Sequence, residues 1–102
     1  MKIVFTPQSR DDLREVENYI SQVLDNPTAA RSITQKVLKS ALLLEKNPRL
    51  GIELSKKIER ETPYRCLFSG NYGIFYFEDG QEIRVIRILD LRTDYLKSIF
   101  ES

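Results

Sequence analysis

Three short runs of β-branched and aromatic residues follow one another in the last third of the chain. They span Tyr64–Phe68, Tyr72–Phe77 and Glu82–Leu89, and this composition favours β-strands. Only two turn-like segments, Ser69–Asn71 and Glu78–Gln81, separate the runs, and the second contains Asp-Gly, one of the strongest short-range signals for a hairpin. The pattern predicts a three-stranded antiparallel meander.

A helical period dominates the first half of the chain, where it predicts a helix over Arg10–Leu24. Its apolar positions are Leu13, Val16, Ile20, Val23 and Leu24. Ser9 is a favoured N-cap residue. Asp11 and Asp12 follow in the first turn, where the helix dipole favours carboxylates. We therefore expect both aspartates to be helix-start residues without a catalytic role.

A second helix is predicted from Pro27, a residue suited to the first helical position, to about Lys46. One apolar stripe along it consists of Ala30, Ile33, Val37, Ala41 and Leu44. Leu38 and Leu42 form a second row, which lies about 100–140° from the centre of the stripe. This row either packs on the first helix or, together with Leu43, stays exposed as a partner site.

Elements in the order β-α-α-β-β-β therefore predict an α+β fold. A short N-terminal strand, Lys2–Thr6, precedes an antiparallel helical hairpin, whose apolar stripe needs a mainly antiparallel sheet to cover it. Residues 47–63 show no clear period and are expected to be an irregular loop or a poor edge strand. A short terminal helix is possible over 93–100. With 102 residues, we expect one domain spanning 1–102.

Composition excludes several classes of chemistry. The chain has no histidine and one cysteine, Cys66, so zinc sites built on histidine, Ser-His-Asp triads, Cys-His dyads and disulfide frameworks are ruled out. We expect no metal and no cofactor. The net charge of +1 argues mildly against a protein that depends on nonspecific phosphate contacts. The sequence shows no membrane span and no signal peptide, so we expect a cytoplasmic protein.

Arginines near the meander are the best candidates for chemistry. Simple alternation along the last strand puts Arg84 and Arg87 on opposite faces of the sheet. Arg65, Arg87 and Arg92 would form a guanidinium cluster if the register allows it, flanked by tyrosines. Such a cluster suits phosphate binding and base stacking. The flanking tyrosines are Tyr72, Tyr76 and Tyr95. In the alternative, Arg87 pairs with Asp90 or Asp94, and Arg92 is solvated.

Taken together, the element order and several motifs resemble the RelE/ParE superfamily of type II toxin–antitoxin toxins. The motifs are Phe5–Leu13, Asn47–Gly51, Tyr64-Arg65, Ser69–Tyr72, Ile74–Tyr76 and Arg87–Tyr95. No single motif is specific, but their order and spacing together are, and they cover essentially the whole chain. The resemblance implies two different activities on one fold. RelE-like members are ribosome-dependent mRNA endoribonucleases, whereas ParE-like members poison DNA gyrase and need no nuclease site.

Carrying the resemblance over residue by residue separates these activities. Arg65 matches a basic position on the first meander strand, Arg92 the basic residue after the last strand, and Tyr95 roughly a C-terminal tyrosine. Gly73 stands where RelE-like nucleases usually carry an arginine, and Leu67 where a second lysine is expected. Each lost charge-assisted bond to phosphate is worth about 1.5–3 kcal/mol, so these departures favour the ParE-like activity.

The expected function is therefore the toxin of a two-gene module that inhibits gyrase by binding and stops growth, as plasmid-stabilising systems do. The alternative is an mRNA endonuclease that uses Arg65, Arg87 and Arg92 around the phosphate and Tyr95 against a base. The resemblance implies a cognate antitoxin as partner in both cases, with gyrase or the ribosome and its mRNA as target. We expect Leu38 and Leu42 to contact that antitoxin through an amphipathic helix.

Overall fold

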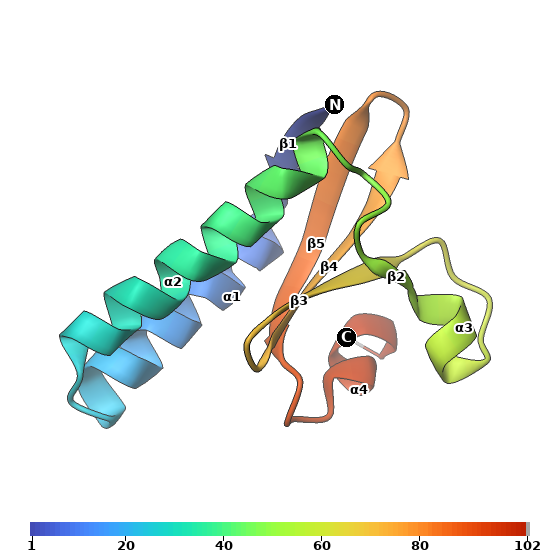
Figure 1. The fold of residues 1–102 in the computed structure, drawn as a ribbon. Helices are drawn as coiled ribbons and strands as arrows, with labels where there is room; N and C mark the ends of the chain where they lie inside the picture. The colour runs from blue at the N-terminus through green and yellow to red at the C-terminus, as the bar shows by residue number, and fades with distance from the viewer. Residues whose placement is uncertain (102) are drawn as a thin grey trace.

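A computed structural model describes residues 1–101 as one five-stranded sheet with helices on both sides (Figure 1). The strands are β1 (Lys2–Phe5), β2 (Ile52–Glu53), β3 (Arg65–Ser69), β4 (Tyr72–Asp79) and β5 (Glu82–Asp90). The helices are α1 (Pro7–Asn18), α2 (Pro27–Leu42), α3 (Leu54–Ile58) and α4 (Tyr95–Phe100). The strand order is β1-β5-β4-β3-β2, and only β1 and β5 run parallel. The predicted α+β fold, its helical hairpin and its antiparallel meander are confirmed.

The first helix begins three residues before the predicted start. Thr6 is the N-cap, with its hydroxyl accepting a hydrogen bond from the Ser9 amide at 3.2 Å, and Pro7 occupies the first helical position. Ser9 is fully buried, and its hydroxyl donates to the Thr6 carbonyl. The prediction of Ser9 as N-cap was wrong, because Thr6-Pro7 supplies both a capping oxygen and a preset backbone.

A π-helical turn, η1 (Tyr19–Val23), continues α1. The Leu24 amide bonds to the Tyr19 carbonyl five residues back, so the turn holds one more residue than an α-helical turn. This extra residue rotates everything that follows it. Ile20 is buried as predicted, but Val23 and Leu24, expected on the apolar stripe, are 67 % and 55 % exposed.

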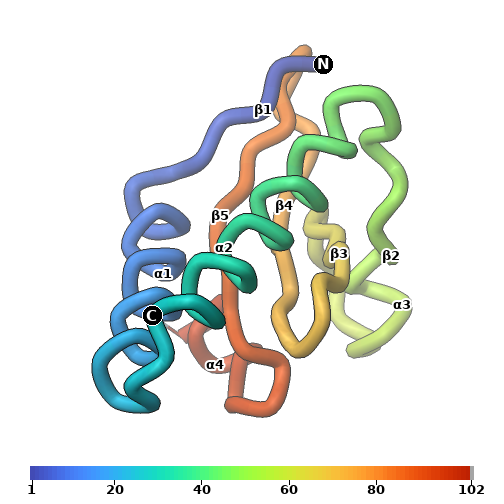
Figure 2. Tube along the Cα trace, turned by 60° about the vertical axis from the view of Figure 1, so that its left-hand side comes forward, coloured from blue at the N-terminus to red at the C-terminus, as the bar shows by residue number. Residues whose placement is uncertain are grey.

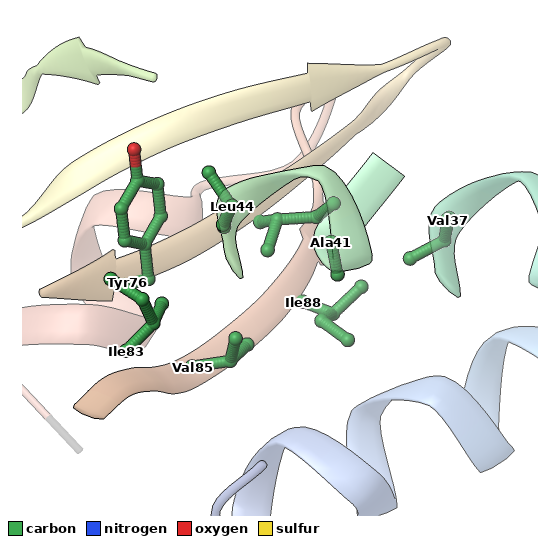
Figure 3. Packing of buried hydrophobic residues seen from close by; sticks show 8 residues of the cluster. Val37, Ala41, Leu44, Tyr76, Ile83, Val85 and Ile88 are labelled. Carbon is green, nitrogen blue, oxygen red and sulfur yellow. The ribbon is translucent and has the colours of Figure 1, made fainter. Parts of the chain in front are cut away.

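The second helix follows its predicted pattern closely. Asn26 caps it by accepting from the Ala29 amide, Pro27 is its first residue, and a 3-10 turn, η2 (Leu43–Glu45), ends it. The stripe faces the sheet, where Val37, Ala41 and Leu44 pack on strand residues (Figure 3). The strand residues of this core are Ile74, Tyr76, Ile83, Val85 and Ile88. We call this side of the sheet the hairpin face.

The opposite side of the sheet, which we call the tail face, carries a second, smaller core. Cys66 and Phe75 are buried there with Leu54 of α3, and α4 covers them with half-buried residues that include Ile99. Figures 1 and 2 show the helical hairpin on one side of the sheet and α4 on the other. The segment 47–63, expected to be an irregular loop or a poor edge strand, contains the two-residue edge strand β2, which confirms the second alternative, and the short helix α3.

A β-bulge in β5 decides which residues belong to each face. Tyr76 pairs with Val85 while Phe75 pairs with Arg87, so Ile86 has no partner on β4. Cross-strand partners share a face, and the extra residue shifts the alternation beyond it. Arg84, opposite Phe77, and Arg87 therefore lie on the same face. The prediction that they lie on opposite faces was wrong because simple alternation does not anticipate a bulge.

Candidate functional site

Arg65 lies on the hairpin face and is engaged by its own chain. Its register partner is Tyr76. One Nη donates to the Gly51 carbonyl at 2.8 Å, and the other lies 3.7 Å from a Glu53 carboxylate oxygen. The guanidinium thus ties the start of β3 to the loop before β2, and only 23 % of the side chain is exposed.

Arg87 lies on the tail face in a nearly buried ion pair with Asp12. Two parallel hydrogen bonds of 2.8 and 2.9 Å join its guanidinium to the carboxylate, and a third reaches the Ser98 carbonyl of α4 at 3.0 Å. The hydrogen bonds from Asp12 raise the pKa of Arg87, although burial opposes that shift. The partners expected for Arg87, Asp90 and Asp94, were wrong.

Asp12 is a structural residue that sequence reasoning misread as an ordinary helix-start carboxylate. It is 3 % exposed, and besides Arg87 it accepts a hydrogen bond from the Ile88 amide at 2.9 Å. The pairing of β5 with β1 ends at Val85. Beyond that point the Asp12 carboxylate accepts a backbone hydrogen bond of β5 that no β1 residue accepts. A signal for this burial was present, because Asp12 stands in helical phase with Val16 and Ile20.

Arg92 follows β5 and is the most exposed of the three arginines. Its Nε and one Nη hold both carboxylate oxygens of Asp90 at 3.0 and 2.8 Å, and its side chain is 66 % exposed. The hydrogen bond from Arg92 holds the pKa of Asp90 below its ordinary value. The pKa of Tyr72, the register partner of Asp90, is raised by burial and by that carboxylate.

The three arginines do not form one cluster. Arg65 and Arg87 lie on opposite faces, and only Arg87 and Arg92 line a common cleft, which has a volume of about 730 Å³. Asp12, Glu15 and Asp90 line it too, so carboxylates outnumber guanidinium groups. The cleft is a poor binding site for a phosphate group, since its net charge is negative.

The tyrosines expected beside the arginines are also separated. Tyr72 lines the cleft. Tyr76 is fully buried, where its hydroxyl accepts from the Gly51 amide and donates to the Pro48 carbonyl. Tyr95 stacks on Phe75 in the tail-face core, with ring centroids 5.6 Å apart.

Gly73 marks where the tail face is closed. A Cβ added there would lie 2.7 Å from a Leu91 methyl group, 2.9 Å from the Phe75 ring and 3.0 Å from the Cys66 sulfur. Any larger side chain would have to displace this packing.

Burial raises the pKa of the Cys66 thiol to about 12, which makes the thiol a poor nucleophile. Residues 1–101 contain no group of three His, Cys, Asp or Glu side chains placed to hold a metal ion.

The second apolar row of α2 remains accessible to a partner. Leu38 is 37 % exposed, and Leu42 and Leu43 are 50 % and 57 % exposed. Leu38 borders a hollow of about 450 Å³ whose other wall includes Phe5 and Leu13. The row is therefore not buried under α1, which was one of the two interpretations of the sequence.

None of the helices in the described part of the chain is long and apolar enough to cross a membrane.

Comparison with known proteins gives two findings that agree with each other. Residues 3–95 match the model of the family described as the ParE toxin of the type II toxin–antitoxin system parDE. A solved structure described as the chromosomal ParDE TA system from P. aeruginosa matches with a TM-score of 0.74 and 21 % sequence identity. This match covers 89 % of the present chain and 96 % of the other. A search of curated protein sequences found no significant match.

Proposed function

The chain belongs to the ParE toxin family of type II toxin–antitoxin systems, and on that premise we propose that it inhibits DNA gyrase by binding. The family match confirms the superfamily expected from the sequence and its ParE-like branch. The chain is thus the toxin of its module, and an antitoxin is implied as its partner. Action on gyrase places the proposed site of action in the cytoplasm.

The closed tail face at Gly73 is the observation that carries this proposal. An RNA-cleaving toxin of the same superfamily is expected to project an arginine from that position. In this chain Leu91, Phe75 and Cys66 fill the space, and α4 covers the same core. A phosphodiester could reach that face only if the core opened.

The engaged arginines support the same proposal. Arg65 is bound to a backbone carbonyl, Arg87 to Asp12 and Arg92 to Asp90. Cleavage through a ribose 2′-hydroxyl also needs a group near neutral pKa to take the proton. The sequence has no histidine, and two of the three carboxylates of the cleft, Asp12 and Asp90, are paired with guanidinium groups. RNA cleavage remains the rival outcome that the experiment below distinguishes.

Induction of the chain alone in a bacterial cell tests the proposal. A gyrase inhibitor should disturb the nucleoid and block DNA replication before protein synthesis falls. Primer extension on abundant mRNAs should then show no codon-phased ends. Rapid loss of protein synthesis with discrete ends inside codons, while nucleoids stay normal, would show that the chain is a nuclease.

For the antitoxin, we propose that it covers the row formed by Leu38, Leu42 and Leu43. An amphipathic helix, disordered in the free antitoxin, would lay its apolar side along the row. Burying two leucine side chains contributes roughly 3–5 kcal/mol before ordering costs. Because parts of both side chains are already covered, the lower end of that range applies.

The double variant Leu38→Glu/Leu42→Glu tests this surface. We expect it to fold, since both side chains are exposed, and to bind the antitoxin at least about tenfold more weakly. Leu50→Glu is the matched control, because Leu50 is 43 % exposed outside the row. A folded double variant that binds the antitoxin as tightly as wild type does would place the interface elsewhere. An unfolded one would show that the row belongs to the core.

A further inference from the structure

Three segments that are far apart in the sequence meet at one end of the molecule. They are the tip of the helical hairpin, the turn between β3 and β4, and the loop after β5 (Figure 2). Tyr19, Tyr72 and Arg92 line both the 730 Å³ cleft and a second hollow of about 290 Å³ beside it. These three side chains therefore lie between the two hollows and belong to both. We call the two hollows together the tip cleft.

The π-helical turn determines the apolar part of the tip cleft. Tyr19, the first residue of the turn, is 54 % exposed, and Leu24, which follows the turn, is 55 % exposed; both line the smaller hollow. π-Helical turns are uncommon and occur frequently at functional sites. Unbroken helical spacing would place Leu24 on the same face as the buried Ile20. The inserted residue turns Leu24 away from that face, so that it lines the same hollow as the Tyr19 ring.

Arg92 provides a donor that Asp90 orients at the same place. Asp90 holds its Nε and one Nη in a two-pronged contact and also accepts from its backbone amide at 2.9 Å. The other Nη forms no hydrogen bond within residues 1–101 and, with the side chain 66 % exposed, faces solvent. Since a guanidinium carries five N–H donors, this contact orients the group while leaving donors for a ligand.

Charge on the walls selects the kind of ligand. Two carboxylates, Asp12 and Asp90, are already neutralised by Arg87 and Arg92. Glu15 lines the cleft as well and has no ion pair in the described chain. The remaining charge is thus negative, which disfavours nucleic acid. It favours a protein segment with a basic residue facing Glu15.

We propose that the tip cleft is the surface with which the toxin grips its target protein. The occupant is an extended segment of gyrase. One of its carbonyl or carboxylate oxygens accepts from the free Nη of Arg92, an apolar side chain packs against Tyr19 and Leu24, and a basic side chain faces Glu15. This assignment rests on the proposed inhibition of gyrase. It also separates the target surface from the leucine row, because the two lie at opposite ends of the helical hairpin (Figure 1).

Inhibition of supercoiling by purified variants tests the assignment. The double variant Tyr19→Ala/Arg92→Ala should need at least about tenfold more toxin for half-inhibition. Glu15→Lys, which reverses a surface charge without touching packing, should need severalfold more. Three matched controls should keep the wild-type value. Phe68→Ala removes a ring that is 46 % exposed, and Arg49→Ala removes an arginine that is 77 % exposed and 3.7 Å from its partner. Glu61→Lys reverses the charge of an exposed residue elsewhere. Thermal unfolding followed by circular dichroism confirms that each variant is folded.

Each outcome decides the proposal. Wild-type toxin that inhibits gyrase, with both test variants impaired and all three controls unaffected, supports it. Wild-type inhibition with unimpaired test variants overturns this assignment and leaves the proposed function standing. No inhibition by wild-type toxin overturns both. If the test variants bind the gyrase tetramer normally without DNA and lose affinity only for its DNA complex, the cleft contacts nucleic acid and the assignment is wrong.

Discussion

The two faces of the same sheet are covered in different ways. On the hairpin face, buried side chains from α2, η2, β4 and β5 exclude water almost completely, as with Val37, Leu44 and Val85. On the tail face, α3 and α4 are single short turns, and no residue of α4 is fully buried. Cationic side chains add contacts with aromatic rings there. Lys57 Nζ lies 5.1 Å from the centroid of the Phe68 ring, and Arg60 Cζ lies 4.1 Å from the centroid of the Phe100 ring.

The larger buried core therefore lies on the hairpin face. The tail face carries a thinner apolar layer, which fills the space around Gly73. The Asp12–Arg87 pair links the two regions, since it joins α1 to β5 and, through the Ser98 carbonyl, to α4.

The largest expected effect comes from breaking that link. Asp12→Ala leaves a nearly buried guanidinium and the Ile88 amide without their acceptor, and should lower the free energy of unfolding by about 3–5 kcal/mol. Asp11→Ala is the matched control on the next residue. Among residues 1–101 the Asp11 carboxylate pairs only with Arg14, and it is 56 % exposed, so Asp11→Ala should cost less than about 1 kcal/mol. Equal urea denaturation midpoints for the two variants would contradict the linking role.

The same truncation on each face sharpens the comparison. Ile88→Ala removes a fully buried side chain from the hairpin-face core and should cost about 2–5 kcal/mol. Ile99→Ala removes a half-buried side chain from α4. The space that it leaves can close or fill with water, so the substitution should lower the free energy of unfolding by only about 1 kcal/mol. Chemical denaturation of both variants checks this order, and a reversed order would mean that α4 is a main source of stability.

A methyl group at Gly73 probes the closed face itself. Gly73→Ala must push aside Leu91 or the Phe75 ring and should cost about 1–3 kcal/mol. Gly70→Asn is the control, because Gly70 has a φ of +58° with no heavy atom within 4 Å of an added Cβ, and asparagine tolerates that conformation. A Gly73→Ala variant that melts like wild type would show that the tail face has spare room.

The smallest effect on stability concerns Cys66, whose burial changes mainly its reactivity. Its raised pKa of about 12 compares with an ordinary value of 9.0. At pH 8 the folded protein should react with iodoacetamide at least about a hundredfold more slowly than the urea-unfolded chain, since the thiolate is the nucleophile. Because the unfolded chain releases this proton first, the thiol lowers stability as the pH rises above 9. Rapid alkylation of the native protein would mean that the tail face opens readily.

How far the sequence predicts this molecule depends on whether a pattern is local. The stripe of α2 and the turn signals at Gly70 and Gly80 are local, and they placed the second helix and the meander correctly. The bulge at Ile86 and the π-turn at Tyr19 each insert one residue into a regular period, and tertiary packing determines where. Simple periodicity therefore wrongly put Arg84 and Arg87 on opposite faces of the sheet, and wrongly put Val23 and Leu24 on the apolar stripe of the first helix.

The candidate site was harder to predict for the same reason. Arg87 is paired across the fold with Asp12, 75 residues away, and no spacing rule reports a contact of that range. The departures at Gly73 and Leu67 were nevertheless visible in the sequence. They favoured the ParE-like activity before the filled space at Gly73 gave that preference a physical basis.

The most direct test is a supercoiling titration with purified gyrase, relaxed plasmid and purified toxin, run with and without an excess of antitoxin. We expect micromolar toxin to stop supercoiling, antitoxin to restore it, and mRNA on translating ribosomes to stay uncut at the same concentration. Unchanged supercoiling at that concentration, together with cut mRNA, would show that the chain is a nuclease and does not inhibit gyrase.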